Sequence, residues 1–270
     1  MRMRIPRRTA SRRTALAAGA LALLAATSAP GVAQATGGGP STPKPTVVLV
    51  HGAWADSSSW TRVMERLRAD GYPVRALANP LQGLTSETAY VSSYLATIDG
   101  PVVLVGHSYG GAVITNSAAS DPDVKALVYI AGFIPVKGES VGDLAARSTP
   151  PIPLVETPVP DGTEVSIDPA HFREVFAGDL DKTTATDLAT TQRPANIRAV
   201  SEPSAEEAFR SIPSWDLITR QDHAIAPGLQ RTMAQRAGAH TEEVDASHAV
   251  MISRPDKVTH VIEEAARNTR

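Results

Sequence analysis

The sequence predicts an α/β domain with a mainly parallel, doubly wound sheet and an inserted helical lid. Short apolar runs alternate with segments of helical periodicity over residues 46–131, and the alternation resumes over residues 214–267 after a proline-rich interval. Such alternation predicts a parallel sheet with helices on both faces. The chain has 270 residues, of which 42% are hydrophobic, so it can bury the core of one large domain.

The first half of this domain contains four predicted strands and three predicted helices. The run T-V-V-L-V lacks polar alternation, as expected for a strand covered on both faces. Downstream of it, Trp60, Val63 and Leu67 recur at helical spacing, and Gly71 follows as a stop signal. The predicted strands are 46–50, 72–78, 102–105 and 124–131, and the predicted helices are 57–70, 86–98 and 110–119.

The interval at about residues 136–213 interrupts this pattern and is predicted to be a helical lid. Prolines cluster there, and strand-like runs are scarce. Asp168 and Pro169 predict the start of a helix, because Asp is a favoured N-cap and Pro fits the first helical position. After the lid, strands are predicted at 214–219 and 241–244 and helices at 227–238 and 255–267.

The first 35 residues have the order of an export signal. Six arginines without an acid precede a 12-residue apolar run, and Ala33 and Ala35 fit the small-x-small pattern of a signal-peptidase site. The apolar run is shorter than the roughly 17–25 residues of a membrane-spanning helix, so no stable membrane anchor is expected. Arg12 and Arg13 resemble a twin-arginine motif, which favours that route over general secretion. We therefore expect a secreted protein, with a disordered arginine-rich tail as the alternative.

The remaining chain is expected to consist of a Gly/Pro linker at 36–45 and one domain at 46–270. The whole chain has a net charge of −2, but removal of residues 1–35 leaves 20 basic and 28 acidic residues, a net charge of −8. Such an acidic chain is not expected to bind nucleic acid. Without cysteine it has neither disulfides nor thiol chemistry. No histidine pair has ligand spacing and no dinucleotide motif occurs, so neither metal nor cofactor is expected.

The segment Gly106-His107-Ser108-Tyr109-Gly110 lies between a buried strand and a helix rich in small residues. This is the setting of a nucleophile elbow, a tight turn that exposes a serine hydroxyl at the edge of the sheet. A side chain at either glycine would strike neighbouring backbone. The motif alone is common by chance and could form an ordinary strand-to-helix turn, but its position makes Ser108 the candidate nucleophile.

A serine hydroxyl needs a base, and His248 is the candidate among seven histidines. It follows the last predicted strand, where the base is expected in the chain order Ser…Asp…His. His240 precedes that strand, and His260 lies inside the last helix. The base in turn needs a carboxylate to orient it. Asp222 is the candidate, because it follows strand 214–219 and functional groups collect at the carboxyl ends of parallel strands.

Other aspartates fit less well, since Asp216 lies inside the strand and Asp245 is too close to His248 in sequence.

The reaction also needs donors for the oxyanion. The backbone N–H of Tyr109 is one candidate, and the turn after the first strand offers a second at Ala53.

Together, the segments V-V-L-V-H-G-A-W, G-H-S-Y-G-G, Q-D-H-A-I-A-P and A-S-H-A-V-M resemble the α/β-hydrolase superfamily. More narrowly, the chain resembles the small-ester hydrolases grouped with plant methylesterases and hydroxynitrile lyases. Those lyases carry a lysine directly after the catalytic histidine, where this chain has Ala249. The resemblance implies the α/β-hydrolase fold, a catalytic triad and an oxyanion hole. The residues concerned are Ser108, Asp222 and His248 for the triad, and Ala53 and Tyr109 for the oxyanion hole.

These residues predict a secreted serine carboxylesterase that acts on a small-molecule ester through an acyl-enzyme intermediate. The lid is expected to set the substrate, and Trp54, beside the oxyanion turn, suggests binding of a small or medium apolar group. Two alternatives stay open. One is another chemistry on the same triad: a hydroxynitrile-lyase-like reaction, acyl transfer or perhydrolysis. The other is a non-enzymatic ligand-binding protein with this fold. The oligomeric state is left open.

Overall fold

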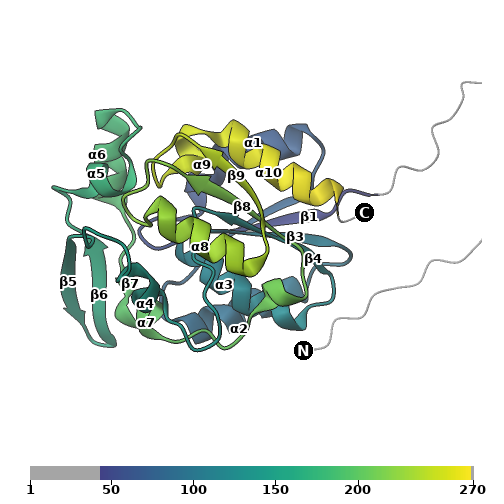
Figure 1. Ribbon diagram of the computed structural model, residues 1–270, viewed down its shortest axis with the longest axis horizontal. Coiled ribbons are helices and arrows are strands. Elements are labelled where there is room, and N and C mark those ends of the chain that lie inside the picture. Colours follow the sequence, from purple (N-terminus) through teal and green to yellow (C-terminus); the bar gives the residue numbers. More distant parts are fainter. Residues whose placement is uncertain (1–42, 269–270) are drawn as a thin grey trace, which may run out of the picture. The chain divides into compact units, whose positions relative to one another are not determined.

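The computed structural model describes residues 43–268 (Figure 1). The predicted export signal, residues 1–35, and residues 36–42 of the predicted linker lie outside this range. Of the helices in the described part of the chain, none is long and apolar enough to cross a membrane.

Within residues 43–268, a six-stranded parallel sheet in the order β2-β1-β3-β4-β8-β9 forms the centre of the fold (Figure 1). β1 and β3 pair in register from Thr46↔Val102 to Val50↔Gly106. Each strand contains a continuous run of four apolar residues and is almost entirely buried, because helices cover both faces of the sheet. The prediction of a mainly parallel sheet is confirmed. The strands are β1 (Thr46–Val50), β2 (Val74–Leu77), β3 (Val102–His107), β4 (Val124–Ile130), β8 (Ser214–Thr219) and β9 (His240–Val244).

The helices form two layers, one on each face of the sheet, which confirms the doubly wound arrangement (Figure 1). On one face, Leu67 of α1 and Ile262 of α10 share an apolar core with Val105 of β3. On the other face, Leu95 of α2 and Met233 of α8 belong to a second core. The short helix α9, directly after the loop of the candidate base, was not predicted. The helical elements are η1 (Ser57–Trp60), α1 (Thr61–Ala69), α2 (Leu84–Leu95), α3 (Tyr109–Ser117), η2 (Ala118–Ser120), α8 (Pro227–Ala237), α9 (Val250–Ser253) and α10 (Pro255–Arg267).

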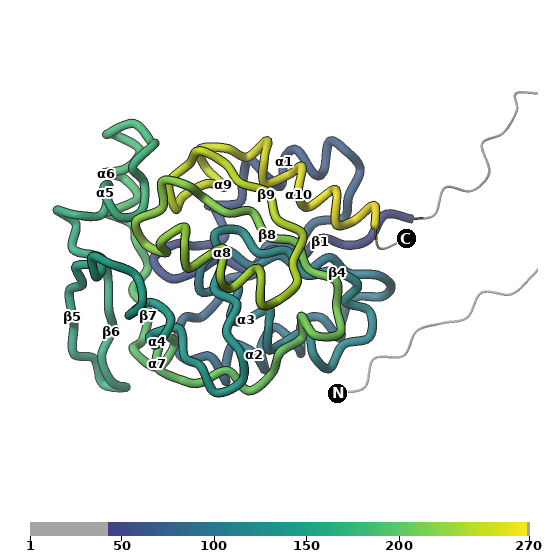
Figure 2. Tube along the Cα trace, viewed as in Figure 1, coloured from purple at the N-terminus to yellow at the C-terminus, as the bar shows by residue number. Residues whose placement is uncertain are grey.

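The lid, residues 136–213, leaves the sheet after β4 and returns to it at β8 (Figure 2). The expectation of a helical lid is incomplete, because this segment also contains a three-stranded antiparallel sheet in the order β5-β6-β7. β5 is exposed along nearly its whole length, so it lacks the apolar alternation that marks a half-buried strand. The lid elements are α4 (Val141–Ala145), β5 (Leu154–Val159), β6 (Gly162–Ile167), α5 (Phe172–Phe176), α6 (Lys182–Thr191), β7 (Ala195–Asn196), α7 (Ile197–Ser201) and η3 (Ala208–Arg210).

The predicted helix start at Asp168 and Pro169 is wrong. α5 begins at Phe172, and the Asp168 carboxylate accepts a hydrogen bond from the Ala170 N–H at 2.9 Å. An aspartate can satisfy a nearby backbone donor in a turn as well as at a helix start, so the Asp-Pro pair is compatible with both.

The core also encloses a carboxyl group without a polar partner, that of Asp216 in β8. The side chain is fully buried, and neither carboxyl oxygen has a hydrogen-bond partner among the described residues. Burial raises the pKa of Asp216 well above its usual range. In the unfolded chain the same group ionises near pH 4, whereas in the folded protein it stays protonated to a higher pH. Because the unfolded state then binds fewer protons, this group lowers stability as the pH rises above about 4.

Asp216→Asn is expected to remove this pH dependence. The free energy of unfolding of the variant relative to the wild type should increase between pH 4 and pH 8, by at most about 1.4 kcal/mol per pH unit. Urea unfolding at a series of pH values measures the difference. Asp161→Asn, at an exposed position, is the matched control for the same change of side chain. A difference between Asp216→Asn and wild type that stays constant from pH 4 to pH 8 would contradict the raised pKa.

Candidate active site

Ser108 lies in the turn between β3 and α3 in a conformation that few residues adopt. Its φ is 53° and its ψ is −125°, which typically costs about 1–3 kcal/mol. Backbone hydrogen bonds hold the turn. The Ser108 N–H donates to the Ile130 carbonyl at 3.2 Å, and the Ser108 carbonyl accepts from the N–H groups of Gly111 (2.9 Å) and Phe133 (3.0 Å). The strained strand-to-helix turn that the motif predicts is therefore present.

Gly106 and Gly110 allow this turn to pack closely against its neighbours. A Cβ on Gly106 would overlap the Gly110 carbonyl, and a Cβ on Gly110 would lie 2.5 Å from the Val50 carbonyl oxygen. Both obstacles are backbone atoms, so they cannot rotate away. The loop after β1 is equally close, since a Cβ on Gly52 would lie 2.6 Å from the Cβ of Ser108. The turn that carries Ala53 therefore lies against the serine.

His248 and Asp222 meet although they are 26 residues apart in the chain. His248 Nδ1 donates to Asp222 Oδ2 at 2.8 Å, and both side chains are fully buried. This bond places the proton of the neutral ring on Nδ1 and leaves Nε2 as an acceptor. Nε2 has no hydrogen-bond partner among the described residues, Ser108 included. Bonds between a catalytic base and its serine often tighten only when substrate is bound.

The Asp222 carboxylate is oriented by donors from its own loop, β8, α8 and the loop of His248. Oδ1 accepts from two backbone N–H groups of its own loop, and Oδ2 accepts from side chains of β8, α8 and the candidate base. Sequence reasoning missed Gln230, although a polar residue on the buried face of a helix is a signal for such a role. The donors are the N–H groups of Ala224 and Ile225 (2.8 Å each), Thr219 Oγ1 (2.8 Å), Gln230 Nε2 (3.0 Å) and His248 Nδ1 (2.8 Å).

His107 packs directly behind the candidate base, a role that its place in the motif did not reveal. Its Nε2 donates to the His248 carbonyl at 3.0 Å, and the two ring centroids lie 4.7 Å apart. Full burial lowers the pKa of His107 well below its usual range and keeps the ring neutral. His107 therefore joins the loop of His248 to the turn that carries Ser108.

Two backbone N–H groups beside Ser108 have no acceptor among the described residues, those of Ala53 and Tyr109, although both residues are buried. Buried N–H groups without a partner are rare, so these two are available for a bound group. His51 shapes the turn of Ala53, because its Nδ1 donates to the Gly52 carbonyl at 2.9 Å and its Nε2 accepts from the Asn79 N–H at 3.0 Å. These are the two N–H groups that the sequence predicts as oxyanion donors.

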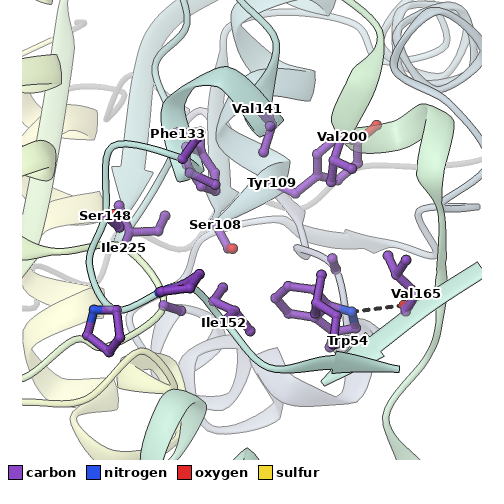
Figure 3. A pocket seen from close by; sticks show the side chains of 18 residues that line it. Trp54, Ser108, Tyr109, Phe133, Val141, Ser148, Ile152, Val165, Val200 and Ile225 are labelled. Atoms are coloured by element: carbon purple, nitrogen blue, oxygen red, sulfur yellow. Dashed lines mark hydrogen bonds between the residues drawn. The ribbon is translucent and has the colours of Figure 1, made fainter. Parts of the chain in front are cut away.

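A cavity of about 280 Å³ opens beside Ser108 (Figure 3). Apolar side chains surround it, among them Phe133, Ile152 and Ile225, and none of the described residues that line it is charged. The lid supplies much of the wall through α4, β5, β6 and α7. Trp54, which the sequence suggests as a substrate contact, also lines the cavity.

The lid contacts the loops after β1, β8 and β9, which carry Ala53, Asp222 and His248. In each loop, one of these contacts is a hydrogen bond from a backbone N–H to an oxygen of the lid. After β1, Trp54 donates to the Arg193 carbonyl (3.1 Å); after β8, Ala226 donates to Ser148 Oγ (3.2 Å); after β9, Ala249 donates to the Phe176 carbonyl (2.9 Å). Phe176 also places its ring 4.8 Å from that of His248.

A group of potential metal ligands lies on β9 and α10, outside this site. Glu242, His260 and Glu264 have ligand atoms within 4.8 Å of one another. None of the three lines the cavity.

Comparison with known proteins identifies the family. A model of the alpha/beta hydrolase family matches residues 47–261. The chain belongs to the alpha/beta hydrolase family. The match covers β1, the turn of Ser108 and the loops of Asp222 and His248, so the whole candidate site lies within the shared region.

Several relatives of this alpha/beta hydrolase are named esterases or hydrolases. It is 26% identical to esterase PIR7B of Oryza sativa subsp. japonica, over 79% of this chain and 91% of that protein. It is also 26% identical to methylesterase 18 of Arabidopsis thaliana, over 81% of this chain and 96% of that protein. A crystal structure of a pyrethroid hydrolase from Sphingobium faniae JZ-2 matches with a TM-score of 0.70 at 24% identity, over 83% and 97% of the two chains. The predicted fold, the resemblance to methylesterases and the hydrolase class are confirmed.

Proposed function

We propose that this alpha/beta hydrolase is a serine esterase that cleaves small-molecule carboxylic esters through an acyl-enzyme intermediate. The observation that carries the proposal is the hydrogen-bonded pair of Asp222 and His248, joined through His107 to the strained turn of Ser108. Serine, aspartate and histidine follow one another in the order typical of this fold. The unpaired N–H groups of Ala53 and Tyr109 meet the remaining requirement, an oxyanion hole.

In the first half-reaction, Ser108 Oγ attacks the ester carbonyl and its proton passes to His248 Nε2. Asp222 holds the ring and stabilises the imidazolium that forms. The N–H groups of Ala53 and Tyr109 bind the oxyanion, each stabilising the transition state by about 2.7–4 kcal/mol. The alcohol leaves with the proton from His248. In the second half-reaction, water attacks the acyl carbonyl and gives a proton to His248, which returns that proton to Ser108 Oγ as the bond between Oγ and the acyl group breaks and the acid leaves.

A short p-nitrophenyl ester and a serine-reactive fluorophosphonate test this chemistry together. We expect turnover of p-nitrophenyl acetate and labelling of Ser108, located by peptide mass spectrometry. Labelling without ester turnover would indicate lyase or transferase chemistry on the same residues. Absence of both would indicate a binding protein. Cyanohydrin cleavage is disfavoured, because Ala249 replaces the lysine that the related lyases carry.

The cavity is expected to select uncharged esters. Since no charged side chain among the described residues lines it, a carboxylate placed there would lose its hydration without gaining a partner. We expect kcat/KM for p-nitrophenyl butyrate to exceed that for mono-p-nitrophenyl succinate by about 100-fold, or about 2.7 kcal/mol. The two acyl chains have the same length and differ by the terminal carboxylate. Equal kcat/KM values, after correction for spontaneous hydrolysis, would contradict this selectivity.

Export by the twin-arginine route is part of the proposal. Its support is the order of arginines, apolar run and small residues within residues 1–35. Protein recovered from the culture medium should begin at Thr36, and the double change Arg12→Lys with Arg13→Lys should retain it in the cell. Secreted protein that still begins at Met1 would contradict this.

A further inference from the structure

Trp54 directly follows the oxyanion donor Ala53 and has an unusual backbone conformation. Its φ is 62°, in the left-handed region that favours glycine, so surrounding contacts must hold it there. Two hydrogen bonds do so. The backbone N–H donates to the Arg193 carbonyl at 3.1 Å, and the indole N–H donates to the Val165 carbonyl at 3.0 Å (Figure 3). Both acceptors belong to the lid.

Val165 is a well-anchored acceptor. It is buried in β6, the middle strand of the lid sheet, and it lies opposite Glu156 of β5 and Ala195 of β7. Val165 and Trp54 both line the cavity beside Ser108 (Figure 3). The indole therefore links the lid sheet to the turn of the oxyanion donor along a wall of the cavity.

We propose, on the basis of the esterase function above, that Trp54 is a positioning residue through which the lid sheet sets the placement of the Ala53 N–H. The turn after β1 is held on one side of Ala53 by the bond of His51 to Gly52 and on the other side by Trp54. An oxyanion donor acts only within a narrow range of distances from the developing charge. A small shift of Ala53 therefore weakens transition-state binding more than it weakens substrate binding.

Two substitutions separate the indole hydrogen bond from the packing of the ring. Trp54→Phe keeps a large apolar ring and removes the donor. Trp54→His keeps an N–H at the corresponding atom of the five-membered ring and removes the six-membered ring. The readouts are kcat and KM for p-nitrophenyl acetate at pH 8.5, where an ordinary imidazole is neutral. Active sites are counted by titration with a fluorophosphonate.

Trp54→Phe is expected to lower kcat about 10-fold while KM changes by less than about 3-fold, and Trp54→His is expected to retain the higher kcat of the two. A wild-type kcat in Trp54→Phe overturns the inference, and so does a higher kcat in Trp54→Phe than in Trp54→His. A loss confined to KM also overturns it, because it assigns the ring to substrate packing. Trp215→Phe, in β8 and outside the cavity, is the matched control and should keep wild-type kinetics.

A second measurement uses the wild-type protein and does not depend on the folding of a variant. In a ¹⁵N NMR spectrum, the indole N–H signal of Trp54 should shift when a fluorophosphonate modifies Ser108, because the phosphonyl oxygen then occupies the oxyanion hole. The indole signals of Trp60 and Trp215 should shift less. If the Trp54 signal does not shift in fully modified protein, this inference is wrong but the esterase proposal is unaffected. A wild-type protein that neither turns over the ester nor reacts with the fluorophosphonate overturns the esterase proposal, and this inference with it.

Discussion

Ser108→Ala is expected to lower kcat for p-nitrophenyl butyrate by about 10⁴- to 10⁶-fold, because without Oγ no acyl-enzyme can form. The rate that remains is expected to come from the cavity and the N–H groups of Ala53 and Tyr109. Alanine keeps Cβ and faces the same backbone penalty at a φ of 53°, so the turn should keep its shape. Steady-state kinetics give the loss, and the melting temperature should stay within about 4 °C of wild type.

Ser117→Ala is the matched control for the loss of a buried serine hydroxyl. Ser117 lies at the end of α3, and its Oγ has no hydrogen-bond partner among the described residues. The variant should keep the wild-type kcat. If Ser108→Ala instead keeps more than about 1% of the wild-type kcat, Ser108 is not the nucleophile.

Asp222→Asn is expected to lower kcat by about 10⁴-fold while leaving the fold intact. The N–H groups of Ala224 and Ile225 bind Oδ1, so the amide oxygen should take that place and the amide NH₂ should face His248. An NH₂ group cannot accept the proton of Nδ1. The ring then favours the tautomer with its proton on Nε2, which cannot take the proton of Ser108. Kinetics as a function of pH measure the loss of kcat, and ¹⁵N spectra of the His248 ring show whether the tautomer has changed.

Asp245→Asn is the control for this change. Asp245 precedes His248 by three residues, is exposed, and pairs with Arg220 at 2.7 Å. It should therefore leave kcat unchanged. If Asp245→Asn lowers kcat strongly and Asp222→Asn changes kcat little, the orienting carboxylate has been assigned to the wrong residue.

The sheet and the order of the candidate residues were predictable because both depend on local patterns. β1 and β3 each contain an uninterrupted run of four apolar residues, and α10 begins and ends at the predicted residues, Pro255 and Arg267. Once the strands are parallel, their carboxyl ends share one edge of the sheet. Asp222 and His248 each follow a strand, so the topology alone brings them to the same edge as Ser108.

The lid and the supporting residues were harder to predict because their roles depend on contacts between distant segments. β5 pairs with β6 but stays exposed, so burial leaves no periodic pattern in its sequence. The turn at Asp168 uses the same residue types as a helix start. His107 gains its role only when the loop of His248 returns to the nucleophile turn, a contact across 141 residues of chain.

The lid's bonds to the loops of Ala53, Asp222 and His248 bear on how this enzyme could be redesigned or could diverge. A lid taken from a relative would have to present carbonyls in the places of Arg193 and Phe176 and a hydroxyl in the place of Ser148. A lid chosen only for the side chains that face the cavity would alter substrate selectivity. Because it would also lack these hydrogen-bond acceptors, it would slow the reaction as well. We therefore expect substrate preference and turnover to change together when the lid is exchanged.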